Sequence, residues 1–365
     1  MLGDRLWAGL DIGEEKSFLS AIDAGNQLVL EQSLPTDSLA IAAALDELGS
    51  HRIEYIAVEA GATTLPLVRV LRAIGYPVLV CETRQVSRYL RVRVNKTDAN
   101  DSRGLAEIAK LGLTRLARVH VKSSEVQRLR SKLVFRHKLN QHRVACEGMI
   151  RSLIRLHGGK VKTALSSKTF QRNVETALEE MKTELQVDLG AEVLPLLSLS
   201  LSLRVFLREL EVQLTAWAKA DSVCSNFMAI PGIGPICAIS FYSAIEDPHR
   251  FEKSTDVGPY LGLTPLVLQS GKSLRHASIS KRGNKLTRTH LTMAASVILL
   301  HCGPSRLSTW GKAIAERAGP GKARVALARK LAVLMLAMWR SGKRYDPAFD
   351  ISHVATRPVS STMSN

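Results

Sequence analysis

The stretch that decides the fold reads KTDANDSR and covers residues 96–103, and the run GLAEIAKL follows it directly at residues 104–111. The apolar residues of that run recur at helical spacing, which predicts a helix. Thr97 is suited to be its N-cap. Asp98 then falls in the first turn and Asp101 one turn later, so the two carboxylates share a face of the helix.

Two interpretations of this acid pair are open from the stretch alone. Neighbouring carboxylates repel each other, which favours a bound cation, a basic partner or a raised pKa. Acids in a first turn also stabilise a helix through its dipole, without any further role. The choice between these two interpretations therefore depends on acidic residues elsewhere in the chain.

Two further acids occupy places where a strand normally carries apolar side chains. Asp11 lies within the first expected strand and Glu59 at the end of the fourth. Taken singly, Asp11 could be a strand-end or turn residue and Glu59 an exposed strand end. The expected order is strands at 7–13, 17–23 and 27–34, a helix at 38–48, a strand at 53–58, a helix at 65–74, a strand at 77–81 and a helix at 82–93.

Taken together, the positions of the four acids along the expected strands and helix resemble those in an α/β ribonuclease-H-like fold, in its Holliday-junction-resolvase-like version. In that fold, acids at strand ends and on a nearby helix converge on divalent metal. The resemblance implies a metal site made by Asp11, Glu59, Asp98 and Asp101. Their oxygen donors suit Mg²⁺, which leaves positions for water and phosphate. Phosphoryl transfer uses such a metal to neutralise phosphate charge.

Charge and composition indicate the class of partner. The 365 residues are 45% hydrophobic, which is ample for buried cores, and carry a formal net charge of +17 with a pI of about 9.9. So basic a chain favours nucleic acid, with a membrane surface as the rival. We see no signal peptide, no run of about 20 apolar residues and no metal-binding spacing among the five scattered cysteines. We therefore expect a cytoplasmic, nucleoid-associated protein that does not bind membranes.

The middle of the chain is expected to be helical. Apolar residues at helical spacing between 194 and 217 fit a coiled coil that links domains or pairs subunits, and fit core packing within one chain equally well. Basic residues crowd the first part, so we favour a phosphate-binding surface over a merely solvated face. These residues are Arg115, Arg118, Lys122, Arg128, Arg130, Lys132, Arg136, Lys138, Arg143, Arg151 and Arg155.

A helix-hairpin-helix turn is predicted at residues 230–235, which read IPGIGP. Gly232 and Gly234 would supply unusual backbone angles and bare amides that can hold a DNA phosphate. An ordinary turn between two helices is the alternative. Further on, the chain reads GLTP at 262–265, QSGK at 269–272 and ISKRG at 279–283, and helices are expected at 285–301 and 321–339.

These motifs, in their order and spacing from about residue 6 to 345, resemble the DEDD transposases of insertion-sequence family 110, which are bridge-RNA-guided recombinases of bacterial mobile elements. The resemblance implies a metal-binding domain at 1–122, a helical or coiled-coil linker at 123–220 and a mostly α transposase domain at 221–345. We expect a disordered tail at 346–365.

The resemblance also implies a serine nucleophile, Ser270, which would become covalently linked to a DNA phosphate. From the residues alone, a serine before a glycine in a polar loop is an ordinary turn residue. Ser273, Ser278 and Ser280 are close enough in sequence to leave the register of the nucleophile open. The basic residues nearest to it, as candidates to hold DNA phosphates, are Lys272, Arg275, Lys281 and Arg282.

Three functional hypotheses follow. The first is an RNA-guided DNA transposase with Ser270 as nucleophile, Mg²⁺ on the four acids, donor and target DNA and a structured noncoding RNA as partners, and a homodimer or homotetramer as the working form. The second is a metal-dependent junction nuclease in which water is the nucleophile. The third is a nonenzymatic nucleic-acid-binding protein whose acids are structural.

Overall fold

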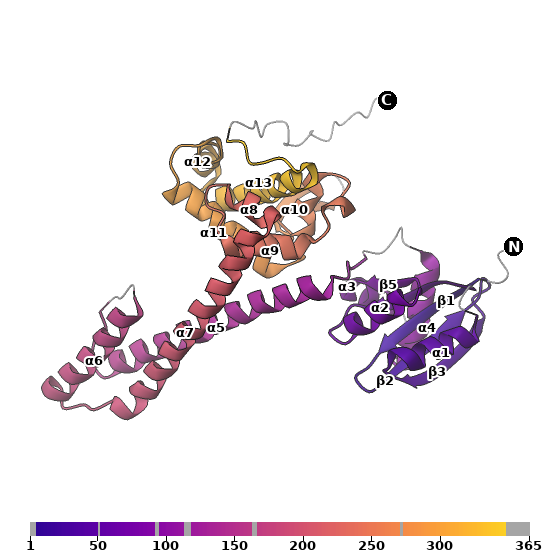
Figure 1. Ribbon diagram of the computed structural model, residues 1–365, viewed down its shortest axis with the longest axis horizontal. Helices are drawn as coiled ribbons and strands as arrows, with labels where there is room; N and C mark the ends of the chain where they lie inside the picture. Colours follow the sequence, from indigo (N-terminus) through magenta and orange to yellow (C-terminus); the bar gives the residue numbers. More distant parts are fainter. Residues whose placement is uncertain are drawn as a thin grey trace. The chain divides into compact units, whose positions relative to one another are not determined.

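The protein consists of two compact units, Met1–Lys122 and Ser123–Asn365. The computed structural model in Figure 1 describes residues 5–49, 52–91, 95–112, 118–162, 166–270 and 273–347. The side chains of residues 167, 267–270 and 273–277 lie outside this description, as does most of the predicted tail at 346–365. The predicted linker at 123–220 falls in the same compact unit as the C-terminal region.

A five-stranded sheet forms the centre of the first unit, in the order β3-β2-β1-β4-β5. The first three strands are antiparallel neighbours, whereas β4 and β5 run parallel to β1. All five predicted strands are present, within a few residues of their expected bounds. These strands are β1 (Leu6–Ile12), β2 (Lys16–Ile22), β3 (Leu28–Pro35), β4 (Ile53–Glu59) and β5 (Val78–Cys81).

Helices cover both faces of this sheet, because its inner strands carry apolar side chains on both sides. Residues of α1 (Ser38–Glu47) and α2 (Thr64–Ala73) join the core on one face. Residues of α3 (Thr83–Leu90) and α4 (Asp98–Leu111) join the core on the other. The N-cap of α1 is Asp37, whose carboxylate accepts from two backbone amides at 3.0 Å.

Gly9 lets α4 lie directly against β1. A Cβ atom at this position would come within 2.0 Å of the Ser102 carbonyl oxygen and 2.2 Å of the Ala106 nitrogen. Both atoms are helix backbone and cannot move aside as a flexible side chain would. The contact between β1 and α4 therefore requires a residue without a side chain at position 9.

The second unit begins with a pair of long helices, α5 (Ser124–Leu156) and α7 (Gly190–Ala220), which lie against each other. The shorter α6 (Ser167–Glu184) packs with them around Phe170 and Met181 to form a separate core at one end of the pair. At the other end, Leu133 and Leu214 join the core of the C-terminal helices. The apolar spacing seen in the sequence is thus used, at least in large part, for packing within the chain (Figure 1).

Glu147 is a buried carboxylate that ties α5 to α7. Its Oε1 accepts from Arg143 at 2.8 Å and from Arg204 Nη2 at 2.6 Å, and its Oε2 lies 3.8 Å from Arg151 Nη1. The Arg151 guanidinium also stacks 4.7 Å from the centre of the Phe170 ring. A carboxylate that is only 5% exposed is stable there because several cations surround it.

α7 is long and apolar enough to cross a membrane by length and composition alone, although Glu192 and Arg204 keep its uncharged run well short of about 20 residues. Core helices of soluble proteins meet the same criterion. Arg204 in the middle of α7 pairs with Glu147, and Leu197, Leu207 and Leu214 are buried by neighbouring helices. These contacts are those of a helix that packs within a protein unit.

Among the described residues, the C-terminal part holds two helices, Val257–Tyr260 and Arg306–Ala318, and one hairpin that the sequence did not predict. The predicted helix 285–301 is present with those bounds, whereas the helix Arg306–Ala318 was missed. The region expected as a polar loop contains an antiparallel hairpin of two strands. The remaining elements are α8 (Ser222–Met228), α9 (Pro235–Ile245), α10 (Val257–Tyr260), β6 (Pro265–Ser270), β7 (Ser273–Ile279), α11 (Lys285–His301), α12 (Arg306–Ala318) and α13 (Pro320–Ser341).

Replacing Gly9 with alanine should destabilise the first unit by at least about 3 kcal/mol, because the new methyl group meets helix backbone. Hydrogen exchange of the β1 and β4 amides across a denaturant series measures this loss. Gly25→Ala is the matched control, since a Cβ there comes no closer than 3.3 Å to the Asp23 side chain. Equal stability of the two variants would contradict the close contact.

Replacing Glu147 with glutamine should destabilise the second unit by about 2 kcal/mol, because Arg143 and Arg204 lose the negative charge that they surround. Glu211→Gln is the control. Glu211 accepts from Arg136 Nε at 2.8 Å but is 43% exposed, so its loss should be below about 1 kcal/mol. Chemical denaturation of both variants provides the comparison, and a larger effect for Glu211→Gln would exclude the role given to Glu147.

Candidate active site

Asp11 and Glu59 lie side by side at the ends of two parallel strands. Leu10 of β1 is the register partner of Val58 of β4, and each acid is the next residue along its strand. Side chains alternate between the faces of a sheet, so Asp11 lies on the same face as Gly9 and Trp7. That face is the one against which α4 packs.

The start of α4 brings the other two acids to the same edge of the sheet. Thr97 is the N-cap as predicted, and its Oγ1 accepts from the Asn100 amide at 3.1 Å. Asp98 and Asp101 both fall in the first turn, with Asp98 exposed and Asp101 half-buried. The four predicted acids therefore belong to one region of the first unit.

Buried serines hold α4 in its place over the sheet. The hydroxyl groups of Ser20 on β2 and Ser102 on α4 are 2.7 Å apart, and neither side chain is exposed. The Ser102 hydroxyl also lies 3.0 Å from the Ala99 carbonyl oxygen, to which it can donate. Ser102 thus joins the helix to the sheet one residue after Asp101.

Arg103 supplies a second connection on the outer side of α4. Its Nη2 donates to Glu31 Oε1 on β3 at 2.8 Å. This ion pair holds the pKa of Glu31 below its usual range and raises that of Arg103. The pairing crosses from helix to sheet, so the sequence around residue 103 alone could not show it.

The electrostatics of Asp11 reflect this gathering of acids. Burial raises its pKa most, followed by the charges of Asp101, Asp98 and Glu59, while Lys96 opposes the shift. The result is a pKa of about 6 in place of 3.8. The other three carboxylates thus add to the effect of burial on Asp11.

Glu59 has a raised pKa for similar reasons. Burial contributes most, a hydrogen bond from Thr83 opposes it, and Asp101 raises it further. Lys96 again favours the charged form. Lys96 and Thr83 are neighbours of the site that no sequence pattern indicated, although Lys96 begins the stretch 96–103 that contains Asp98 and Asp101.

The donor set fits a divalent cation by its chemistry, because it consists of carboxylate oxygens whose repulsion a cation relieves. Within the described ranges, however, no group of three or more acidic, histidine or cysteine side chains is arranged so that it could hold a metal ion as it stands. The acids share one edge of the sheet, but metal binding requires their side chains to turn toward one another.

Ser270 belongs to the second unit, where it ends β6 and is the register partner of Ser273, the first residue of β7. The hairpin places the residue at the tip of a pair of strands instead of in a loop. Its side-chain position lies outside the described residues, as do that of Arg275 and the whole of Gly271 and Lys272. Lys281 and Arg282 follow the hairpin and are both exposed.

The turn at 230–235 joins α8 to α9, and its two glycines differ in role. Gly232 has a φ of +83°, and a Cβ there would come within 2.7 Å of Ile298 on α11 and 3.1 Å of the Ala294 carbonyl oxygen. Gly232 is therefore required by packing inside the unit. Gly234 is the N-cap of α9, and a Cβ there would meet nothing within 4 Å, so only this glycine faces open space.

Part of the basic run on α5 serves the fold. Arg143 and Arg151 surround Glu147, and Arg136 pairs with Glu211 of α7. Lys122, just before the helix, is buried. Position 115 lies outside the described residues. The basic side chains of this run that are exposed among the described residues are Arg118, Arg128, Lys132, Lys138 and Arg155.

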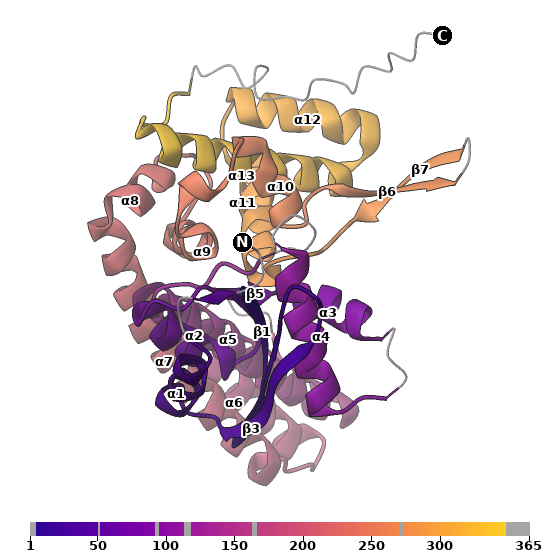
Figure 2. The same cartoon turned by 90° about the vertical axis from the view of Figure 1, so that its right-hand side faces the viewer.

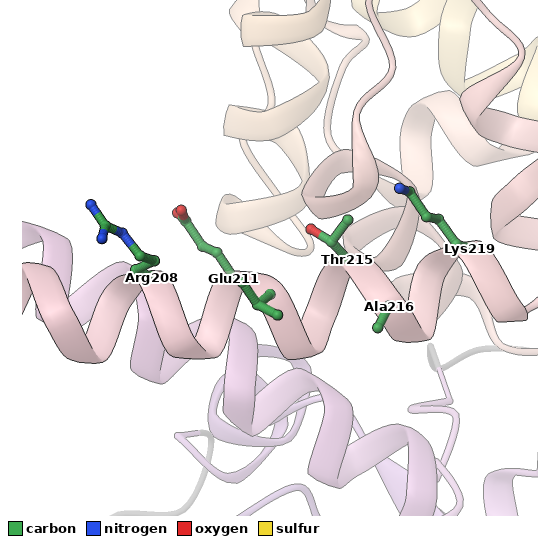
Figure 3. A pocket seen from close by; sticks show the side chains of 6 residues that line it. Arg208, Glu211, Thr215, Ala216 and Lys219 are labelled. Atoms are coloured by element: carbon green, nitrogen blue, oxygen red, sulfur yellow. The ribbon is translucent and has the colours of Figure 1, made fainter.

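A surface depression of about 430 Å³ runs along α7, apart from the predicted site residues. Figure 3 shows the side chains of Arg208, Glu211, Thr215 and Lys219 along this flank of the helix. Glu211 is already paired with Arg136. The depression is thus an outer flank of the α5–α7 pair.

Two family models match the chain. One, described as the transposase IS116/IS110/IS902 family, covers residues 224–310, and the other, the IS110-type DEDD transposase, covers residues 8–157. Together they match more than half of the chain. The acids at 11, 59, 98 and 101 fall within the second model, and Ser270 within the first.

Curated relatives agree with these matches. The chain is 29% identical to the transposase for insertion sequence element IS1111A of Coxiella burnetii, over 92% of this chain and 90% of that protein. It is 28% identical to a probable family 20 transposase of Pseudomonas aeruginosa, over 80% of this chain and 86% of that one. With both family models in order along its length, the chain belongs to the IS116/IS110/IS902 family of transposases, enzymes that cleave and rejoin DNA.

Proposed function

We propose that this transposase cleaves and rejoins DNA through a covalent phosphoserine intermediate, with the four acids as a Mg²⁺ site and Ser270 as the nucleophile. The observation that carries the proposal is the gathering of Asp11, Glu59, Asp98 and Asp101 at one edge of the sheet, where burial first, and then the charges of the other three acids, raise the pKa of Asp11 to about 6. A purely structural cluster would gain nothing from four carboxylates that repel one another. The strand order β3-β2-β1-β4-β5 supports a ribonuclease-H-like interpretation of the same unit.

Asp11 and Glu59 would hold the metal from the strand ends, and Asp98 and Asp101 from the first turn of α4. When bound, Mg²⁺ supplies charge neutralisation for the phosphate and orients the attacking group. The chain's own part is to hold these carboxylates at one edge of the sheet, where burial opposes the ionisation of Asp11 and Glu59. Lys96 assists, because its charge favours the ionised forms of both Asp11 and Glu59.

Ser270 Oγ would attack a DNA phosphorus atom, so that a serine O–P bond forms as the bond from phosphorus to one deoxyribose oxygen breaks. The serine proton ends on the released deoxyribose oxygen, directly or through water. Attack by a deoxyribose hydroxyl on the phosphoserine reverses the step and joins a new strand. The number of phosphodiester linkages is unchanged, so no other energy source is required.

We assign DNA contact to groups of the second unit that face solvent. The amide end of α9 at Gly234 can receive a phosphate oxygen, and Lys281 and Arg282 offer exposed charge. Lys272 and Arg275 are included as proposed DNA contacts because they lie close to Ser270 in the sequence. Gly232 drops out of this set, because its lack of a side chain is explained by α11.

A structured noncoding RNA is the proposed guide, since base pairing with donor and target DNA would supply sequence recognition that this chain does not need to encode. The net charge of +17 supports contact with more than one nucleic acid. Recombination must hold two duplexes, so we propose a homodimer or homotetramer. The acids and Ser270 belong to different units of the chain and would meet within one copy or between two.

Ser270→Ala should abolish the covalent protein–DNA adduct and strand exchange while DNA binding stays within about twofold, because only the nucleophilic oxygen is lost. Gel trapping of the adduct with labelled donor DNA and guide RNA measures it. Ser273→Ala is the matched control, since Ser273 is the register partner of Ser270. Loss of the adduct in the Ser273 variant alone would place the nucleophile on β7.

The same assay separates the alternatives. Mg²⁺-dependent strand cleavage by the Ser270 variant without any adduct in the unaltered protein would identify a nuclease that uses water. Binding without cleavage at any Mg²⁺ concentration, together with unchanged behaviour of Asp11→Asn, would identify a nonenzymatic binding protein.

Asp11→Asn should stabilise the metal-free protein at pH 7.5 by roughly 1–2 kcal/mol, which is the pKa shift converted to free energy and reduced for the solvent screening of this half-buried group. An acid whose pKa is raised on folding destabilises the folded state once it is ionised, so this loss develops from about pH 4 to about pH 6 and persists above. The variant's advantage should therefore vanish near pH 4. Thermal unfolding in a chelator at both pH values tests this.

Added Mg²⁺ should stabilise the unaltered protein at pH 7.5 and leave the Asp11→Asn variant unchanged, because the ion binds ionised carboxylates. The exposed Glu14→Gln is the control and should behave as the unaltered protein does. A less stable Asn variant at pH 7.5 would mean that the charge of Asp11 is already compensated, and the proposed site would be wrong.

A further inference from the structure

The β6–β7 hairpin is joined to the rest of its unit by two short segments that run beside each other, residues 260–264 before it and 280–283 after it. The Ser280 amide donates to the Thr264 carbonyl at 2.9 Å, and the Lys281 amide to the Gly262 carbonyl at 3.2 Å. Figure 2 shows the hairpin extending from this base, away from the helices of the unit. Its direction therefore depends on how these two segments are held.

Two glycines allow the segments to touch. Gly262 has a φ of +68°, and a Cβ there would lie 2.2 Å from the Arg282 carbonyl oxygen. Gly283 has a φ of +74°, and a Cβ there would lie 2.1 Å from the Tyr260 carbonyl oxygen. Lys281 between them also adopts a positive φ of 53°. Backbone so constrained persists only where its surroundings enforce it.

Arg288 on α11 supplies that enforcement. Its Nη1 donates to the Leu261 carbonyl at 3.0 Å, to the Arg282 carbonyl at 2.6 Å and to the Gly283 carbonyl at 3.2 Å. One guanidinium nitrogen thus bonds to both segments at once. The side chain is only 8% exposed, so it is shielded from direct contact with DNA.

α11 is itself firmly attached to the unit, so Arg288 acts from a rigid element. The Asn284 side chain caps the helix by accepting from the Leu286 and Thr287 amides. The Thr287 hydroxyl donates to the Ser240 carbonyl of α9 at 3.0 Å, in the layer next to Arg288. The neighbouring residues Leu291 and Ala295 are fully buried.

We propose that Arg288 is a positioning residue that fixes the base of the β6–β7 hairpin and thereby aims Ser270 at the DNA phosphate. This role rests on Ser270 being the nucleophile proposed above. A two-stranded hairpin is marginally stable by itself, so its tip is only as well placed as its base. Misplacement of a reacting atom by about 1 Å can reduce the rate roughly 100-fold.

Arg288→Lys tests the role, because it keeps the positive charge but replaces the planar guanidinium, whose one nitrogen serves three carbonyls. The expected result is a rate of adduct formation at saturating DNA that falls roughly 10- to 100-fold, with DNA affinity within about twofold. Hydrogen exchange at the Ser280 and Lys281 amides should accelerate. A residue that only stabilised the fold would not produce this separation between rate and affinity.

Arg340→Lys is the matched control, because Arg340 lies in the same unit and donates to one backbone carbonyl, that of Glu252 at 2.9 Å, away from the hairpin. It should leave the adduct rate unchanged. Thermal unfolding reports whether each variant is folded at the assay temperature. Should the lysine variant be unfolded there, Arg288→Gln, which avoids burying an ammonium group, is used for the same measurements.

The outcomes are distinguishable from failure of the proposed nucleophile. If the unaltered protein forms no adduct, or if Ser270→Ala still forms it, the proposed function is wrong and the positioning role falls with it, whatever the amide exchange. If Ser270→Ala removes the adduct while a folded Arg288 variant forms it at the unaltered rate, or keeps slow exchange at Ser280 and Lys281, the positioning role alone is overturned.

Discussion

The contact between the backbones of β1 and α4 at Gly9 is the constraint on which the first unit depends. Because no side chain intervenes, the first turn of α4 comes close enough for Asp98 and Asp101 to act on Asp11. The Ser20–Ser102 hydrogen bond fixes the helix in that place. Packing thus forces together carboxylates that would separate if they were free. A bound cation would relieve the part of the Asp11 pKa shift that comes from the other acids.

The hairpin in the second unit also depends on a close contact between backbone segments at glycine residues. There Gly262 and Gly283 let two backbone segments touch, and one buried arginine bonds to both. In each unit a proposed site residue, Asp11 or Ser270, follows along the chain from a glycine that is in contact with backbone atoms. Backbone contacts permit less adjustment than side-chain contacts. This is why both places tolerate glycine alone.

Local signals in the sequence predicted much of the first unit, and contacts between distant residues account for what was missed. The Thr97 cap, the helix after it and all five strands follow from the spacing of apolar residues and from capping chemistry. The hairpin at 265–279 was missed because its serines and glycine read as a loop. The ion pairs of Glu147 were missed because one of its partners, Arg204, comes from another helix. Arg288 carried no local signal, since its acceptors are carbonyl groups that any residue supplies.

An excess of basic over acidic residues along a helix is a weak guide to a nucleic-acid-binding surface. On α5, Arg136, Arg143 and Arg151 are used by carboxylates within the unit, so the charge they offer to phosphate is reduced. Arg128, Lys132, Lys138 and Arg155 remain exposed on that helix. The net charge of the chain is the same before and after folding. The positions of the unpaired cations, however, depend on which basic side chains form ion pairs within the fold. Binding to phosphate must therefore be assigned from exposed side chains, and a helix contributes only those that its neighbours leave free.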